Sequence, residues 1–183
     1  MGQSVFGHAE RRLDPSSPVV EGLGFPLGTR GQIFSLEDGH ANALAPGKRP
    51  RTTLTPSLAL RHGQPWLAFG TPGGDMQDQW ALQFFLNVVD FGLDLQAALD
   101  APTVHTTHFP SSFYPHAAFP GRVHVEGRIP PDVRAALAGL GHEVHVDGDW
   151  SHGQPTAVAF DPRHGTMAGA ASARSGLPYV MGR

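Results

Sequence analysis

Residues 69–80 read FGTPGGDMQDQW, and they carry the chain from an apolar run through Thr-Pro-Gly-Gly into a segment with helical periodicity. A pair of glycines can expose consecutive backbone N–H groups without a Cβ in the way, and the start of a helix adds about half a positive charge. The junction is therefore either an ordinary strand-to-helix turn or a cradle of backbone amides for an anion. The sequence contains neither a P-loop nor a GxGxxG motif, so phosphate is the less favoured anion.

The residues on either side of this junction have the patterns of a β-hairpin and of a helix. Residues 57–69 form two short apolar runs around His-Gly-Gln, as a hairpin does when glycine supplies the turn. From Asp75 to Phe91 apolar side chains recur on one broad helical face, with Asp75 as the predicted N-cap and Gly92 as the stop. A second short helix is predicted at residues 95–100.

Elsewhere the sequence predicts short strands, tight loops and one further helix. Glycines interrupt residues 19–36, which we interpret as strand and loop, and residues 102–122 show no period and are predicted to form a loop. Residues 130–141 have the pattern of an amphipathic helix, with Pro131 in its first turn and Gly141 at its end. Alternating residues predict strands at 123–127, 143–148, 156–162 and 165–172. Few helices and many antiparallel-looking strands favour an α+β layered fold.

Length, charge and composition limit the class of protein. At 183 residues, 40% of them hydrophobic and 16% charged, the chain is long enough for one globular domain with a real core. A formal charge of -3 provides no basic stripe for nucleic acid, and the absence of cysteine excludes disulfides, cysteine-ligated metals and a thiol nucleophile. No apolar run approaches the roughly twenty residues that span a bilayer, and the N-terminus has no signal-peptide pattern. We therefore expect no nucleic acid, membrane or cofactor as a partner, and a cytoplasmic location by default.

A long polar loop at residues 38–56 carries the second candidate site. It contains Lys48, Arg49 and the adjacent hydroxyl groups of Thr52 and Thr53. Threonine hydroxyls can donate hydrogen bonds to a carboxylate, and an arginine can donate two, so the loop suits a substrate carboxylate. A solvated basic loop without a ligand is the alternative on these residues alone.

Two pairs of histidines have the i, i+3 spacing found in some metal sites. His142 and His145 lie in an alternating strand pattern, which points their side chains to opposite faces. His105 and His108 lie in the predicted loop without a carboxylate at a fixed spacing, and no HExxH motif is present. The sequence therefore does not favour a metal site.

Residues 39–103 contain, in this order, a PGKRP loop, a pair of hydroxyl residues and a predicted strand that ends in GTPGGD. This combination resembles the small, C-terminal subunit of the γ-glutamyltransferase (γ-glutamyltranspeptidase, glutathione hydrolase) family. The likeness extends over residues 16–183 and includes DPRHGTMAGAASARSGLPYVMG near the C-terminus. We therefore divide the sequence into an irregular lead segment, residues 1–15, and a small-subunit-like domain, residues 16–183, that is incomplete at its N-terminus.

The resemblance implies an N-terminal-nucleophile (Ntn) hydrolase with a four-layer αββα fold of stacked sheets, of which this chain forms a part. In such a family a precursor cleaves itself before a threonine, and the new N-terminal Thr attacks a γ-glutamyl amide with its own amine as the base. The acyl group then passes to water or to an acceptor amine. By the same resemblance Gly73 and Gly74 are the oxyanion-hole glycines, and Thr52 and Thr53 match the hydroxyl pair that holds the glutamyl α-carboxylate. The diglycine turn is thus expected to present its amides to an oxyanion.

The sequence departs from the family pattern where the family binds the amino-acid end of its donor. There the family uses a Gln and an Asp, and this sequence has Arg30 and Ile33. Isoleucine cannot pair with an ammonium group, which argues against a glutathione-type γ-glutamyl donor. We expect Arg30 and Arg49 to join Thr52 and Thr53 in holding a substrate carboxylate.

A second departure concerns the nucleophile. The reactive Thr of the family opens a Thr-Thr-His stretch before the segment that begins here at Ser16, and residues 1–15 contain no threonine. Thr106-Thr107-His108 has the same letters, but it lies downstream of the diglycine motif in a predicted loop and is not expected to act as the nucleophile. We therefore predict that this chain alone is inactive, and that activity requires a large-subunit partner chain or an oligomer.

Two functions from different classes stay open. The first is part of an acyl-transfer enzyme that moves a γ-glutamyl-type acyl group from an amide to water or to an amine. The second is a noncatalytic module that binds a small carboxylate through Arg30, Arg49, Thr52 and Thr53, or an inactive remnant of such an enzyme.

Overall fold

The structure is a computed structural model of the chain, and it describes residues 19–25, 28–174 and 180–181. The lead segment predicted at residues 1–15 lies outside the described residues. Two β-sheets and three α-helices organise the described part, so the predicted α+β class is confirmed. No helix among these residues is both long enough and apolar enough to cross a membrane.

Two hairpins form the larger sheet, which is antiparallel throughout and has the strand order β1-β2-β6-β7. Its strands are β1 (Ser57–Arg61), β2 (Gln64–Gly70), β6 (Thr156–Asp161) and β7 (Thr166–Ala171). The predicted turn between β1 and β2 is confirmed: His62 and Gly63 both have positive φ, 52° and 77°, as the two-residue turns that match strand twist require.

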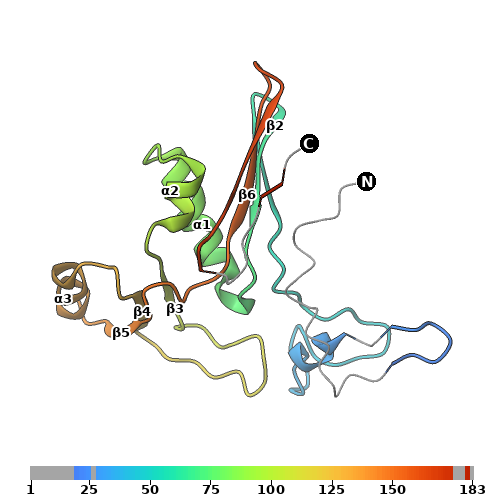
Figure 1. Ribbon diagram of the computed structural model, residues 1–183. Coiled ribbons are helices and arrows are strands. Elements are labelled where there is room, and N and C mark those ends of the chain that lie inside the picture. Colours follow the sequence, from blue (N-terminus) through green and yellow to red (C-terminus); the bar gives the residue numbers. More distant parts are fainter. Residues whose placement is uncertain (1–18, 26–27, 175–179, 182–183) are drawn as a thin grey trace.

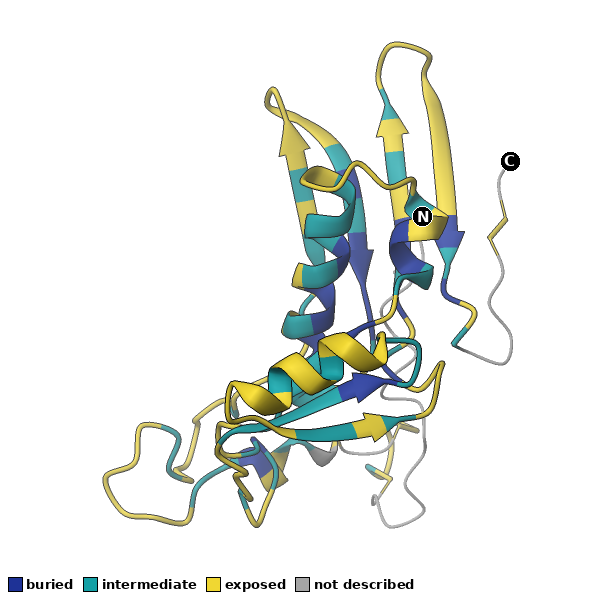
Figure 2. Cartoon of the chain, turned by 90° about the vertical axis from the view of Figure 1, so that its left-hand side faces the viewer, coloured by how far each residue is buried: buried dark blue, intermediate teal, exposed yellow. Residues whose placement is uncertain are grey.

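Helices α1 (Gln77–Val89) and α2 (Leu95–Asp100) cover one face of this sheet, as Figure 1 shows. Buried side chains from both layers form the core beneath them: Leu67, Phe69, Ala81, Phe84, Ala98, Leu99, Ala157 and Ala170. In Figure 2 the buried residues of these layers lie mainly along one strand and on the helix faces that pack on the sheet, whereas the tips of the hairpins are exposed. Helix α2 is capped by Asp94, whose side chain accepts a hydrogen bond from Ala97 N.

The opposite face of the four-stranded sheet is apolar and exposed. Leu58, Leu60 and Met167 are 64%, 59% and 74% exposed, and Val158 and Phe160 lie on the same face. An apolar sheet face is stable when a second layer covers it. Within the described residues, helices α1 and α2 thus form one helix layer and the four-stranded sheet forms one sheet layer.

A smaller sheet has the order β3-β4-β5 and carries helix α3 between its last two strands. Its elements are β3 (Val104–Thr106), β4 (Arg122–Glu126), α3 (Pro131–Gly139) and β5 (Glu143–Asp147). Pro131 opens α3 and Gly141 follows it at φ 95°, as predicted. Strands β4 and β5 are parallel, which corrects the antiparallel expectation, because a helix that joins two strands returns the chain to the same end of the sheet.

Three local predictions were wrong. Strand β3 lies inside the predicted loop at 102–122, where it pairs with β4. The described part of residues 19–36 contains a 3-10 helix, η2 (Thr29–Ile33), where the sequence predicts a strand. Asp75 does not cap α1, which starts at Gln77 after a 3-10 turn, η3 (Gly74–Met76), because the Asp75 carboxylate instead accepts a hydrogen bond from Ser112 N at 2.7 Å.

A buried ion pair ties the two sheets together. The side chains of Glu126, at the end of β4, and Arg174, after β7, are both fully buried and lie 2.6 Å apart. Arg174 also donates to Ala101 O at 2.7 Å, and Glu126 accepts from Thr103 N at 3.1 Å. Burial raises the pKa of Glu126, but the hydrogen bond and charge of Arg174 outweigh it and hold that pKa below its ordinary value.

Candidate functional site

The diglycine corner, Gly73 and Gly74, lies in the connection between the end of β2 and the start of α1. Gly73 and Gly74 have φ values of 142° and 59°, which other residues rarely adopt. A Cβ on Gly73 would overlap the indole ring of Trp80, and one on Gly74 would lie 3.4 Å from the Phe113 ring. Gly73 is nevertheless exposed to solvent, so the corner is open on its outer side. The geometry of the turn requires glycine at both positions; Gly73 is exposed and Gly74 is half-buried beside Phe113.

Gln77 links this corner to the hydroxyl loop. Its carboxamide is 4% exposed, and one orientation satisfies both of its ends. In that orientation the oxygen accepts from Gly74 N at 3.2 Å, and the nitrogen donates to Thr53 O at 3.1 Å and to Thr71 O at 3.0 Å. The Gly74 amide and the Thr53 backbone carbonyl are therefore held by one side chain.

Of the two predicted hydroxyls, only Thr53 turns toward an arginine. Its Oγ1 accepts a hydrogen bond from Arg30 Nη1 at 3.0 Å, and the residue is 6% exposed. Thr52 is exposed, and its Oγ1 accepts from Leu54 N at 3.1 Å within its own loop. Arg49 is exposed on the same loop, and no described residue forms a hydrogen bond or ion pair with it. The structure thus joins Arg30 to Thr53 and leaves Thr52 and Arg49 apart from them.

The loop at residues 107–121 forms one wall of this constellation. Asp75 holds it through Ser112 N at 2.7 Å and Ser111 Oγ at 3.3 Å. Phe113 is thereby placed beside Gly74 and beneath the Arg30 guanidinium, which lies 5.9 Å from the ring centroid. Sequence reasoning missed Asp75, Gln77 and Phe113 in these roles, because the loop has no periodicity and a Gln at the start of a helix gives no functional signal.

The other positions singled out in the sequence, Ile33 and Thr106, are engaged in packing or in backbone hydrogen bonds. Ile33 is 2% exposed and offers no charge to a ligand. Thr106 ends β3, where Gln79 binds both its backbone N–H and its carbonyl, and its hydroxyl donates to Arg122 O at 2.9 Å. No group of three His, Asp or Glu side chains among the described residues has an arrangement that could hold a metal ion.

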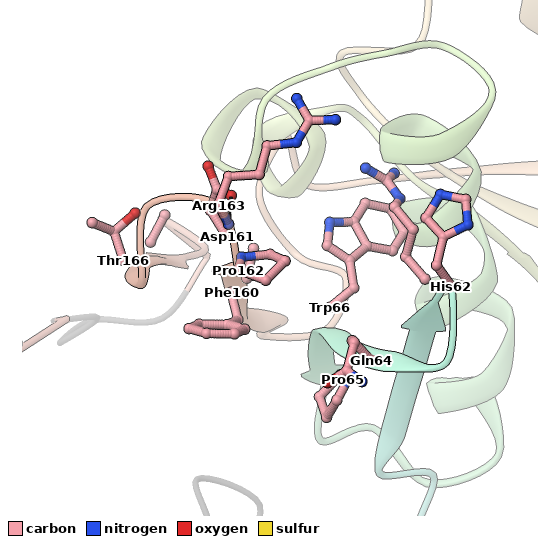
Figure 3. Close-up of a pocket in the computed structure, with 12 residues that line it drawn as sticks. His62, Gln64, Pro65, Trp66, Phe160, Asp161, Pro162, Arg163 and Thr166 are labelled. Atoms are coloured by element: carbon pink, nitrogen blue, oxygen red, sulfur yellow. Dashed lines mark hydrogen bonds between the residues drawn. The ribbon is translucent and has the colours of Figure 1, made fainter.

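A hollow among the described residues lies elsewhere. It has a volume of about 460 Å³ and lies at the tips of the two hairpins, where Trp66, Phe160 and Arg163 line it (Figure 3). Trp66 lies near the start of β2, at the end of that strand opposite the diglycine corner, and Phe160 lies near the end of β6. Arg61 stacks on Trp66 there, with its guanidinium carbon 3.6 Å from the ring centroid. This hollow is therefore separate from the candidate site.

Comparison with known proteins assigns a family to this arrangement. The sequence model of the gamma-glutamyltranspeptidase family matches residues 15–179. The glutathione hydrolase proenzyme of Escherichia coli is 31% identical over 143 residues, which are 78% of this chain and 22% of that protein. This chain spans about a quarter of the length of the curated relatives that it matches.

Solved structures give the same result for the fold. The structure of LmbA2991HD is 57% identical, with a TM-score of 0.84, and the match covers 92% of this chain and 30% of that one. A cephalosporin acylase from Bacillus halodurans is 37% identical with a TM-score of 0.74, over 86% of this chain and 27% of that one. These similarities confirm the expected Ntn-hydrolase fold, of which the described helix layer and sheet layer are a part.

Proposed function

Because this chain belongs to the gamma-glutamyltranspeptidase family, we propose that it supplies the oxyanion-binding and acyl-binding side of an amide-cleaving acyl-transfer site. The reactive Thr of the family comes, in this proposal, from a segment other than these 183 residues. The observation that carries the proposal is the bridge from Gly74 N through Gln77 to the Thr53 segment, with Arg30 on the Thr53 hydroxyl. These contacts bring an amide donor and a cation to the same corner.

The chemistry assigned to the corner is stabilisation of a tetrahedral intermediate. When a Thr hydroxyl oxygen bonds to the amide carbon, the carbonyl electron pair moves onto oxygen. In this proposal the backbone N–H of Gly73 donates to that oxyanion, and the N–H of Gly74 donates to it once it leaves its bond to the Gln77 carboxamide oxygen. The electron pair on the oxyanion then re-forms the C=O bond as the C–N bond breaks. The leaving amine takes the proton that the hydroxyl gave up. One such donor typically contributes roughly 3 kcal/mol of transition-state stabilisation. Before the substrate binds, Gln77 satisfies the Gly74 N–H with its carboxamide oxygen, and the oxyanion replaces that oxygen as the acceptor.

The acyl group that fits this site ends in a carboxylate and carries no ammonium group. Arg30 is bound to Thr53 and stacked over Phe113, so a guanidinium and a hydroxyl lie together near the turn. Ile33 is buried and provides no partner for an ammonium group. A monoamide of a dicarboxylic acid, such as a glutaryl amide, matches these groups better than a γ-glutamyl amide does. A 37% identical relative of known structure is a cephalosporin acylase, which is consistent with a donor outside the glutathione class.

A partner layer completes the site in this proposal. The exposed face with Leu58, Leu60 and Met167 has the apolar character of a surface that another sheet covers. We assign that cover to a large subunit, made in the same precursor or on a separate chain. The same subunit or its junction with this chain would deliver the reactive Thr to the diglycine corner.

The test uses this chain co-expressed with a family large subunit and with the Thr-bearing strands. The assembled protein is assayed for release of anilide from glutaryl-anilide and from γ-glutamyl-anilide, and the glutaryl donor is expected to give the higher kcat/KM. Replacing Arg30 with Gln should raise the KM for the glutaryl donor by about 10-fold or more, because a hydrogen bond to a charged group contributes roughly 1.5–3 kcal/mol. Arg49→Gln is the matched control, since Arg49 is exposed on the neighbouring loop. An assembled protein that cleaves neither amide would contradict the proposal, as would an Arg49 effect that exceeds the Arg30 effect.

One observation also supports the noncatalytic alternative. The Arg30 and Thr53 pair forms within this chain and requires no reactive Thr. Calorimetry with glutarate and with glutamate separates the two functions: saturable binding without turnover by any assembled form favours a carboxylate-binding module.

A further inference from the structure

Three histidines form a row across the smaller sheet. His105 on β3 is the register partner of His124 on β4, and His124 is the register partner of His145 on β5. Register partners in adjacent strands point to the same face. The ring centroids of His105 and His124 lie 4.7 Å apart with parallel planes, and those of His124 and His145 lie 5.2 Å apart.

His152, in the loop after β5, is the fourth member of this cluster. Its side chain is 3% exposed, and its ring lies 4.6 Å from that of His105. Its Nε2 lies 2.8 Å from Asp147 Oδ2, and the same carboxylate oxygen lies 3.1 Å from His124 Nδ1. One carboxylate therefore serves two imidazoles. His105 Nδ1, by contrast, is buried and has no hydrogen-bond partner among the described residues.

The charged groups around the row are already engaged. Arg122 on β4 pairs with Glu143 on β5 at 2.9 Å, and Glu143 also lies 2.7 Å from His145 Nε2. Helix α1 contributes the neutral indole of Trp80 to this cluster. Burial and the neighbouring imidazoles lower the pKa of His105 to about 4. A proton on His105 would thus lie between two imidazoles that share Asp147, without an acceptor of its own.

Trp80 connects the histidines to the diglycine corner. Its ring stacks on His152 at 5.7 Å and meets His105 edge-on at 5.3 Å. On the corner side, the indole occupies the space that a Cβ on Gly73 or on Gly153 would need. A second link runs beside it, because Gln154 N donates to Thr71 Oγ1 at 2.8 Å. The residues 152–154 therefore reach the Thr71–Gly74 turn through an aromatic contact and through a hydrogen bond.

We propose that the histidine cluster, acting through Trp80, supports the diglycine turn while His105 is neutral and releases the turn when His105 takes up a proton. Trp80 and His152 are then positioning residues for the oxyanion-binding amides. The inference rests on the proposed role of Gly73 and Gly74, and it adds a pH-dependent control of that site. A cation on His105 would lie 4.7 Å from the His124 ring and 4.6 Å from the His152 ring without an acceptor of its own. Its ring then moves away from the Trp80 indole, and Gly73 loses the side chain against which its peptide is held.

The test follows backbone and indole N–H signals by NMR in the intact protein between pH 7.5 and pH 3, so that the range passes through the pKa of His105. The chain has three tryptophans, and the Trp80 signal is identified by its loss in Trp80→Phe. We expect the Trp80 indole and Gly74 amide signals to move on one titration curve, whereas the Trp66 indole at the hairpin tips does not follow it. In His105→Gln that shared movement should be lost. In His164→Gln it should persist, since His164 is 73% exposed and pairs only with Asp161 among the described residues.

Two results would overturn the inference. One is a Trp80 signal that stays constant, or that titrates as in the wild type after His105→Gln. The other is simultaneous loss of all three indole signals, which would mean global unfolding instead of release of the turn. In the assembled protein, kcat should fall on the acid side with KM unchanged, and His105→Gln should remove this fall. Absence of any turnover would refute the proposed function, while the NMR titration would still decide the inference.

Discussion

The two sheets of this chain are stabilised in different ways. The four-stranded sheet packs on α1 and α2 through apolar side chains such as Leu67 and Phe84, which are 1% and 3% exposed. The three-stranded sheet has polar groups at its centre: Glu126 is fully buried at the end of β4, and His152 lies 3% exposed beside it. The larger sheet is stabilised by burial of apolar side chains, and the smaller sheet depends on a buried ion pair and on packed imidazole rings.

This difference teaches where substitutions should be most costly and where pH should act. Apolar packing loses stability in proportion to the volume removed and does not depend on protonation. A buried ion pair is sensitive to the loss of either partner, because the other charge is left without compensation. The diglycine corner lies between the regions, with β2 on one side and the histidine cluster on the other.

Removal of Glu126 is the strongest test of the polar region. Glu126→Ala leaves Arg174 fully buried without its partner, and we expect a loss of about 3–5 kcal/mol in unfolding free energy, measured by urea denaturation. Addition of Arg174→Met should restore part of that loss. Glu143→Ala is the matched control, because its ion pair with Arg122 is exposed. Equal effects of Glu126→Ala and Glu143→Ala would contradict the distinction between the two regions.

Truncation of Leu67 tests the apolar region. Leu67→Ala removes a side chain that is 1% exposed in the core beneath α1, so a loss of about 2–5 kcal/mol is expected. Leu60→Ala on the open face of the same sheet, where the residue is 59% exposed, should cost less in the isolated chain. The loss of unfolding free energy in Leu67→Ala should be the same at pH 7 and pH 5. A strong pH dependence of this loss would contradict the distinction between the two regions.

The smallest expected effect is the pH dependence contributed by His105. Its pKa in the folded chain is lowered from 6.5 to about 4, so the unfolded chain takes up the proton first as the pH falls. The neutral imidazole therefore contributes fully above about pH 6.5, and this contribution is lost as the pH falls toward 4. Between pH 7 and pH 5 the wild type should lose about 1 kcal/mol more than His105→Gln, after allowance for the solvent that reaches the ring. Parallel pH profiles of the two proteins would show that His105 does not titrate in this way.

The residues missed by sequence reasoning share a physical feature. Glu126 ends an alternating VHVEG stretch, where a glutamate is normally read as the solvent-facing end of a strand, and its burial depends on Arg174, 48 residues later. Arg30 reaches Thr53 over 23 residues, and Asp75 holds Ser112 over 37. Such pairs leave no period in the sequence. The local sequence predicts Asp75 as the helix N-cap, because nothing near it in the chain indicates that its carboxylate binds Ser112 N.

By itself the sequence determined the α+β class, the β1–β2 turn, the three α-helices to within a few residues, and the need for glycine at 73 and 74. Each of these follows from local geometry, since side-chain periodicity and allowed φ values act within a few residues. Only the tertiary structure decided that Gln77 joins Gly74 to the Thr53 segment, that Arg30 rather than Arg49 binds Thr53, and that four histidines pack together beside Trp80. These contacts join residues that are distant in the chain. The sequence around a polar side chain does not indicate which distant residue it will bind once the chain has folded.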